Sequence, residues 1–116
     1  MVVPEGVTAL GMDCFALSHN LTTVTLPASL TTIERGVFYQ CPRLNHLHIP
    51  AAVARIDEYA LYDCTALTDL YVHAPVPPAA TQISDNRKLR VHIPAASLAA
   101  YQAHECWRSY HLIADL

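Results

Sequence analysis

Hydrophobic and polar positions along the chain repeat with a period of 23 residues. Proline, aliphatic and aromatic residues hold the same places in three successive repeats. The recurring positions are Pro4, Pro27 and Pro50; Leu10, Ile33 and Ile56; Phe15, Phe38 and Leu61; Leu21, Leu44 and Leu67; Val24, Leu47 and Leu70; and Leu26, Ile49 and Val72. A fixed period of about 20 to 50 residues is typical of a solenoid, in which stacked coils share one core.

The last part of each repeat predicts a β-strand. Within residues 44–49, apolar and polar residues alternate, as they do in a strand with one buried face. The equivalent segments of the other repeats are 21–26 and 67–72. Pro27 and Pro50 follow the first two of these segments and end the strands, because proline has a fixed φ and no backbone N–H. One such strand from each stacked coil predicts a parallel sheet.

The first part of each repeat predicts a second, shorter strand or an extended corner, at 30–33 and again at 53–56. The segments that follow, 34–41 and 57–64, are too short to hold as isolated helices. We expect one helical or 3₁₀ turn in each, anchored from inside by a large apolar residue such as Phe38. Each coil alone cannot bury its apolar residues, so stability comes from packing between neighbouring coils.

Beyond residue 72 the 23-residue spacing is no longer kept. Residues 73–94 are rich in proline and predict a degenerate repeat that returns to strand character at 89–93. Residues 95–116 predict a C-terminal cap in which Ser97 caps the N-terminus of a helix near 98–105. The side chains expected to cover the open end of the core are those of Leu98, Tyr101, Trp107 and Tyr110.

These elements predict one domain over residues 1–116, a β-rich α/β solenoid. Short parallel strands would form one sheet, with shorter second strands and helical turns on the other side and a small C-terminal capping helix. The regular repeats occupy 4–26, 27–49 and 50–72. No cap precedes the first repeat, so the coil at 21–26 is expected to expose a sheet edge. Further repeats upstream in a longer protein, or a homodimer through this edge, would cover it.

Composition and charge limit the classes of function that the chain can have. The chain is 53% hydrophobic and 15% charged, which is not the composition of a disordered segment. It has no apolar run of about 18 residues that predicts a membrane span, and its first residues do not resemble a signal peptide. The net charge is −3, and Arg87, Lys88 and Arg90 form the one basic cluster, so nucleic-acid binding is not expected. With three glycines there is no phosphate-binding loop, and no catalytic residue is predicted.

The four cysteines do not predict a disulfide framework. Cys41 and Cys64 share one repeat position, which Ser18 holds in the first repeat, and a cysteine in register is most simply a small buried core residue. Cys14 takes the position of Val37 and is also expected in the core. A bridge between Cys41 and Cys64 is not favoured, because in-register parallel strands seldom give the Cβ directions that a disulfide needs.

The repeats resemble the BspA-type leucine-rich repeat, a 23-residue variety found in surface proteins of bacteria and some protists. The family pattern is I-x-x-x-A-F-x-x-C-x-x-L-x-x-L-x-L-P. The second repeat matches it with Ile33, Val37, Phe38, Cys41, Leu44, Leu47, Ile49 and Pro50, and the third with Ile56, Ala60, Leu61, Cys64, Leu67, Leu70 and Val72. The resemblance covers about residues 2–72. It implies a leucine-rich-repeat solenoid with right-handed coils and a concave sheet. It also implies a secreted or cell-surface protein that binds host extracellular proteins or mediates adhesion.

Strand side chains that point away from the core predict two columns on the face of the sheet. One column is Thr23, His46, Asp69 and Arg90, and the other is Thr25, His48, Tyr71 and His92. Neighbouring strands would place His46 beside Asp69 and His48 beside Tyr71. The predicted partner-binding residues are therefore His46, His48, Asp69, Tyr71, Arg90 and His92.

Three interpretations of this face stay open. The favoured one is a non-enzymatic module that binds a protein, such as a host extracellular protein, or a glycan, with an affinity that changes between about pH 5 and 8. The second is a structural spacer without a ligand, whose polar face is solvated and in which His46 pairs with Asp69. The third is a divalent-metal site of His46, His48 and Asp69, although the second-shell partners that such a site needs are not evident. No other cofactor is implied.

Overall fold

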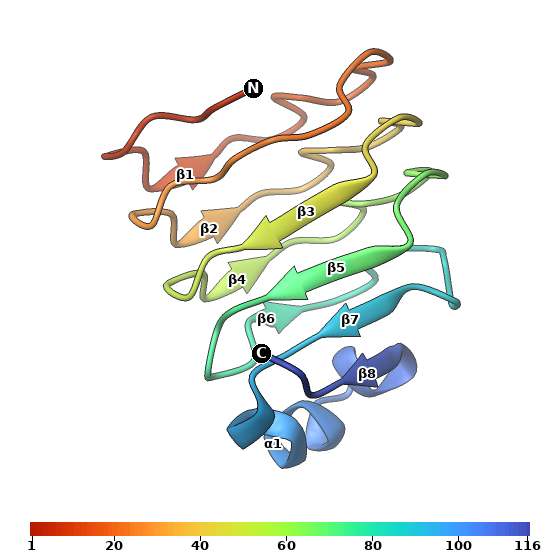
Figure 1. The fold of residues 1–116 in the computed structure, drawn as a ribbon. Helices are drawn as coiled ribbons and strands as arrows, with labels where there is room; N and C mark the ends of the chain where they lie inside the picture. Colours follow the sequence, from red (N-terminus) through yellow and green to blue (C-terminus); the bar gives the residue numbers. More distant parts are fainter.

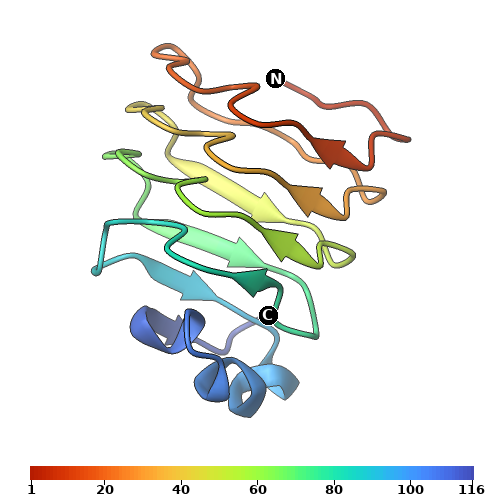
Figure 2. The same ribbon diagram turned by 180° about the vertical axis from the view of Figure 1, so that it is seen from behind.

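The computed structural model describes all 116 residues as stacked coils that contribute strands to two parallel sheets (Figure 1). One sheet has the order β1-β2-β4-β6, and the other has the order β3-β5-β7-β8. Seen from behind, the first sheet lies in front (Figure 2). Its strands are β1 (Ala9–Leu10), β2 (Thr32–Ile33), β4 (Arg55–Ile56) and β6 (Ala79–Ala80). The strands of the other sheet are β3 (His46–Ile49), β5 (Asp69–Val72), β7 (Arg90–His92) and β8 (His111–Ile113).

The strand register follows the sequence period. His46 pairs with Asp69 and Thr32 with Arg55, each 23 residues further along the chain. After the third repeat the spacing in the longer sheet shortens, because Asp69 pairs with Arg90 and Arg90 with His111, each 21 residues apart. The strand predicted at 89–93 is therefore confirmed as β7, whereas β8 was not predicted. The right-handed winding and the concave curvature stay predictions.

Inward-facing side chains of both sheets enter one cluster of 27 buried residues. The recurring aliphatic positions supply most of it, including Ile33, Leu47 and Leu70, which are all at most 1% exposed. This follows from the alternating pattern, since a strand directs every second side chain to the same face. None of the helices has the length and hydrophobicity that crossing a bilayer requires.

The C-terminal segment covers the end of this core as predicted. It comprises η1 (Ala95–Ser97), α1 (Leu98–Ala103), η2 (Trp107–Ser109) and then β8. Tyr101, Trp107 and Tyr110 are buried, and Leu98 is half-buried against the core. The Trp107 indole N–H donates to the Pro78 carbonyl at 2.8 Å, so the cap is tied to the degenerate repeat by a buried hydrogen bond.

The predicted N-cap role of Ser97 is wrong. Its hydroxyl makes no capping hydrogen bond and donates instead to the Pro75 carbonyl at 2.7 Å. The reason is that η1 runs directly into α1, so the helix has no free first turn for Ser97 to cap. The helix also ends at Ala103, short of the predicted 105, because His104 is in an extended conformation.

The single turn predicted in each of 34–41 and 57–64 is present but does not extend into a helix. Each segment has one hydrogen bond of the 3₁₀ type, from Tyr39 N–H to the Gly36 carbonyl at 3.0 Å and from Tyr62 N–H to the Tyr59 carbonyl at 3.3 Å. Two residues of each segment have positive φ, at Gly36 (68°) and Gln40 (55°) and at the equivalent residues 59 and 63. Left-handed residues cannot continue a right-handed helix. Their N–H groups donate to the next coil instead, as Gly36 does to Glu58 and Gln40 to Tyr62, at 3.2 and 2.8 Å.

The edge of the coil at 21–26 is less open than predicted. This segment makes only isolated bridges, one of which joins Thr25 to Val2. The Thr25 N–H donates to the Met1 carbonyl, and the Val3 N–H donates to the Thr25 carbonyl, both at 2.9 Å. The first three residues therefore cover that edge and become the outermost segment themselves, with Val2 72% exposed. A homodimer through this end stays a prediction.

The cysteines are all free. Cys41 and Cys64 are buried, and each thiol donates to a phenylalanine carbonyl of the preceding coil, Phe15 at 3.2 Å and Phe38 at 3.1 Å. The recurring cysteine is thus a hydrogen-bond donor between coils as well as a small core residue. Cys14, which was predicted in the core, is exposed, because no coil packs on the outer side of the first one.

Candidate functional site

The predicted columns lie on the outer face of the β3-β5-β7-β8 sheet. His46, Asp69 and Arg90 are consecutive partners in one column, and His48, Tyr71 and His92 are consecutive partners in the other. The isolated bridge between Thr23 and His46 extends the first column by one residue. The unpredicted strand β8 adds His111 beside Arg90 and Ile113 beside His92.

Four aromatic rings form a continuous stack on this face, in the order His73, His48, Tyr71 and His92. Their successive centroids are 5.1, 4.5 and 4.4 Å apart, and the interplanar angles are at most 16°. His48 Nδ1 also lies 2.8 Å from His73 Nε2, a hydrogen bond whose direction depends on the tautomers. We refer to these four residues as the ring stack. It fixes the Tyr71 ring between two imidazoles, so the ring needs little ordering when a partner binds.

An ion-pair network, the Asp69 cluster, borders the ring stack and consists of Asp69, Arg90, His92 and Asp115. The Arg90 guanidinium donates to both oxygens of the Asp69 carboxylate, from Nε at 2.8 Å and from Nη2 at 2.6 Å. His92 lies between two carboxylates, with Nε2 at 2.7 Å from Asp69 and Nδ1 at 2.9 Å from Asp115. Both ring nitrogens are donors only in the imidazolium ion, so this geometry favours a charged His92.

The pKa values of this face shift in opposite directions along the ring stack. Hydrogen bonds from Arg90, then from His92, hold the pKa of Asp69 well below its usual range against the effect of burial. Burial would lower the pKa of His92, but hydrogen bonds to Asp69 and Asp115 outweigh it and the pKa is raised. Burial, and then the proximity of His73 and His46, lower the pKa of His48. Tyr71 therefore separates an imidazole that favours the neutral form from one that favours the charged form.

Two sequence predictions about this face need correction. His46 is exposed and makes no ion pair with Asp69, because both oxygens of that carboxylate are bonded to Arg90 and His92. For the same reason His46, His48 and Asp69 do not form a metal site, and no group of three or more histidine, cysteine, aspartate or glutamate residues could hold a metal ion. The metal-site hypothesis for these residues is therefore wrong.

The sequence prediction missed His73 and Asp115. His73 follows Tyr71 by two residues, so the strand alternation extended past Val72 would have placed it on the same face. Asp115 follows β8, a strand with no repeat pattern, and nothing in the sequence indicated that the C-terminus returns to the sheet.

Comparison with known proteins points to one family. The family model described as BspA type Leucine rich repeat region (6 copies) matches residues 1–87 of the 116. The match extends past the regular repeats and into the degenerate one. No curated protein matches the chain.

Proposed function

Because the chain belongs to the BspA-type leucine-rich repeat family, whose repeats are generally non-enzymatic interaction modules, we propose that its β3-β5-β7-β8 sheet is a protein-binding face. The residues proposed to contact the partner are His46, His48, Asp69, Tyr71, Arg90 and His92. The six come from three adjacent strands, so one partner surface can reach all of them.

The observation that carries this proposal is the fixed position of Tyr71 and Arg90. Tyrosine and arginine are among the residue types most enriched at binding hot spots. Here the Tyr71 ring is held between His48 and His92, and the guanidinium of Arg90 is held by both oxygens of Asp69. Side chains that are already ordered lose less conformational entropy on binding. The arrangement thus suits a partner whose surface is complementary to a rigid binding face.

We further propose that the chain is part of a right-handed solenoid on a secreted or cell-surface protein, and that its partner is a host extracellular protein. The family relationship supports this, since the resemblance implies adhesion proteins of host-associated microbes. Nucleic acid is not a proposed partner, because the net charge is −3. Membrane insertion is not proposed either.

A binding assay with purified fibronectin, laminin and collagen tests the proposal. The His46→Ala/His48→Ala double variant and the Tyr71→Ala variant remove parts of the proposed face. Arg55→Ala on the opposite sheet is the matched control, because Arg55 is exposed on β4. We expect the wild type and the control to bind at least one probe and both face variants to bind about tenfold or more weakly.

Equal binding by all variants would place the contact elsewhere on the molecule. Binding of none of the three probes by the wild type would favour the alternative of a spacer without a ligand. Urea denaturation of each variant separates loss of contact from loss of folding.

A further inference from the structure

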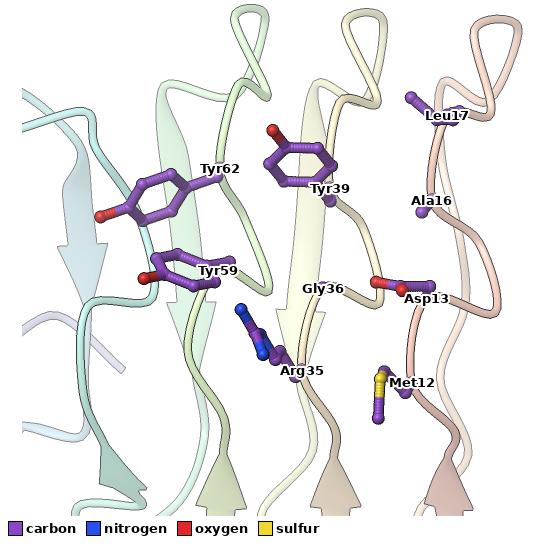
Figure 3. Close-up of a pocket in the computed structure, with 9 residues that line it drawn as sticks. All are labelled: Met12, Asp13, Ala16, Leu17, Arg35, Gly36, Tyr39, Tyr59 and Tyr62. Atoms are coloured by element: carbon purple, nitrogen blue, oxygen red, sulfur yellow. The ribbon is translucent and has the colours of Figure 1, made fainter.

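We propose that the turn side of the molecule carries a carbohydrate-binding groove, separate from the sheet face. The groove has a volume of about 730 Å³ and crosses the turns of the first three coils. Tyr39, Tyr59 and Tyr62 line it together with Asp13 and Arg35 (Figure 3). We call it the tyrosine groove. It shares no residue with the ring stack or the Asp69 cluster, so its test is independent of the proposed protein-binding face.

Two small residues create the hollow. Ala16 takes the repeat position that Tyr39 and Tyr62 hold in the next coils, and Gly36 takes the position that Tyr59 holds in the third. Figure 3 shows both beside the open space between Tyr39 and the first coil. Gly36 has a φ of +68°, and a Cβ built there would lie 2.1 Å from Asp13 Oδ1. A side chain at residue 36 would therefore displace Asp13 and narrow the groove, although the equivalent residues Asp13 and Tyr59 also have positive φ, 58° and 64°.

The tyrosines of the groove differ from the others in the chain. Of the six tyrosines, Tyr101 and Tyr110 are buried and their hydroxyls donate to carbonyls of other coils, and Tyr71 belongs to the ring stack. The remaining three all line the tyrosine groove and are half-buried, and their hydroxyls, like that of Tyr71, make no hydrogen bond in the structure. Figure 3 shows Tyr59 and Tyr62 extending side by side from the third coil, with Tyr39 on the coil before it. Ring faces and free hydroxyls are what the apolar C–H face and the hydroxyl groups of a sugar require.

The charges of the groove favour a neutral ligand. Asp13 and Arg35 carry one charge of each sign, so together they give the groove no net charge that would select an anion or a cation. The Asp13 carboxylate has no hydrogen bond or ion pair, whereas Arg35 lies over the Tyr59 ring at 5.0 Å and 3.7 Å from Glu58. The hydroxyl groups of a sugar can both donate to Asp13 and accept from Arg35.

The backbone of the groove offers few free polar groups to a ligand, because its N–H groups already donate hydrogen bonds to the next coil. Those of Asp13, Gly36 and Tyr59 all donate to carbonyls of the next coil. Recognition therefore depends on side chains. A proline-rich peptide can also dock in an aromatic groove, but its proline residues have no N–H to donate to Asp13. The free carboxylate thus favours a carbohydrate over such a peptide.

NMR titration of the ¹⁵N-labelled chain with neutral oligosaccharides tests the proposal. The probes are the hexasaccharides of maltose, cellulose, xylan and chitin, and decaproline is the peptide probe. We expect at least one sugar to shift the amide signals of Ala16, Gly36 and Tyr39. Tyr39→Ala should weaken that binding about tenfold.

Ala16→Tyr is the sharper variant, since it installs the tyrosine that the next two coils already carry and fills the hollow. It should fold like the wild type and lose sugar binding, whereas the control Tyr71→Ala on the sheet face should keep it. Shifts with decaproline and none with any sugar would overturn the proposal in favour of a peptide groove. No shift with any probe, or sugar binding that survives Ala16→Tyr, would overturn it as well.

Discussion

The sheet face and the tyrosine groove are built by the same stacking of coils, but they differ in how many of their polar groups have a partner within the chain. On the sheet face, Asp69 bonds to Arg90 and His92, and the rings of His48 and Tyr71 stack. In the groove, the Asp13 carboxylate and the hydroxyls of its three tyrosines have no partner within the chain.

The difference comes from which residues share a repeat position. In-register stacking brings equivalent positions of successive coils into contact, so opposite charges or flat rings in one column satisfy each other. A column that changes from tyrosine to alanine, as from Tyr39 to Ala16, leaves a space instead. A repeat protein can therefore make an ordered surface or a hollow without changing its backbone.

The largest expected effect is on the stability of the whole chain, which would disrupt the sheet face and the tyrosine groove together. Phe38→Ala should destabilise the chain by about 3–5 kcal/mol, because the fully buried ring supports the coil that carries both faces. Urea denaturation measures the loss. Phe15→Ala is the matched variant in the first coil, where the ring is half-buried, and should cost less. Equal losses would mean that the first coil is as well packed as the second.

A smaller effect should separate the two faces. Asp69→Ala removes the acceptor of Arg90 and His92 and should cost about 1–2 kcal/mol, since the hydrogen bonds are charge-assisted but Arg90 is exposed. The pKa of His92, followed by NMR, should fall towards its ordinary value. Asp63→Asn is the control, because that carboxylate accepts one longer side-chain hydrogen bond, from Gln40 at 3.3 Å, and asparagine tolerates its φ of 59°. An unchanged His92 pKa in Asp69→Ala would argue against the Asp69 cluster in solution.

On the groove side, Gly36→Ala should cost about 1 kcal/mol, because alanine is disfavoured at a φ of +68° and the Asp13 side chain must move. The NMR signals of Asp13 and Tyr39 should shift, and those of the ring stack should not. Gly11→Ala is the control, since a Cβ there meets nothing within 4 Å. If the two variants were equally stable, the groove floor would not depend on glycine.

The smallest effect is a shallow dependence of stability on pH that His48 and His92 of the sheet face should produce. The folded pKa of His92 is raised, so its contribution is present below the unfolded value of about 6.5 and is lost as pH rises through the folded value. The folded pKa of His48 is lowered, so stability is lost as pH falls below about 6.5. Urea denaturation from pH 5 to 8 should show a weak maximum near pH 6.5.

Two variants test that assignment. His92→Gln should remove the alkaline decline, and His48→Gln should remove the acid decline. His19→Gln, at an exposed position in the first coil, should change neither. Variants that leave the profile unaltered would show that other groups cause it.

The features that depend on the period could be predicted from the amino-acid sequence. The 23-residue register alone places His46 beside Asp69 and His48 beside Tyr71, and the strand pairing confirms both neighbours. The aromatic residues of the cap were also predicted, because a solenoid end must be covered by large apolar side chains.

The remaining features depend on positions that the period does not constrain. β8 has no repeat pattern, so the sequence did not reveal that Asp115 returns to His92. The left-handed residues of the turn at 34–41 were not predicted, because Gln40 is not a glycine and nothing in the sequence indicated its positive φ. The tyrosine groove was not predicted, because it arises where Ala16 has no large side chain at the position that is tyrosine in the next two coils.

The thiol hydrogen bonds between coils have a consequence for chemical labelling. Burial raises the pKa of Cys64 to about 12 and also raises that of Cys41, so both stay protonated and unreactive while the coils are stacked. Cys14 is exposed and can meet a reagent in the folded state. A maleimide should therefore modify Cys14 first and reach Cys41 and Cys64 only when the coils separate. The positions at which a label accumulates would then report, coil by coil, where the molecule opens.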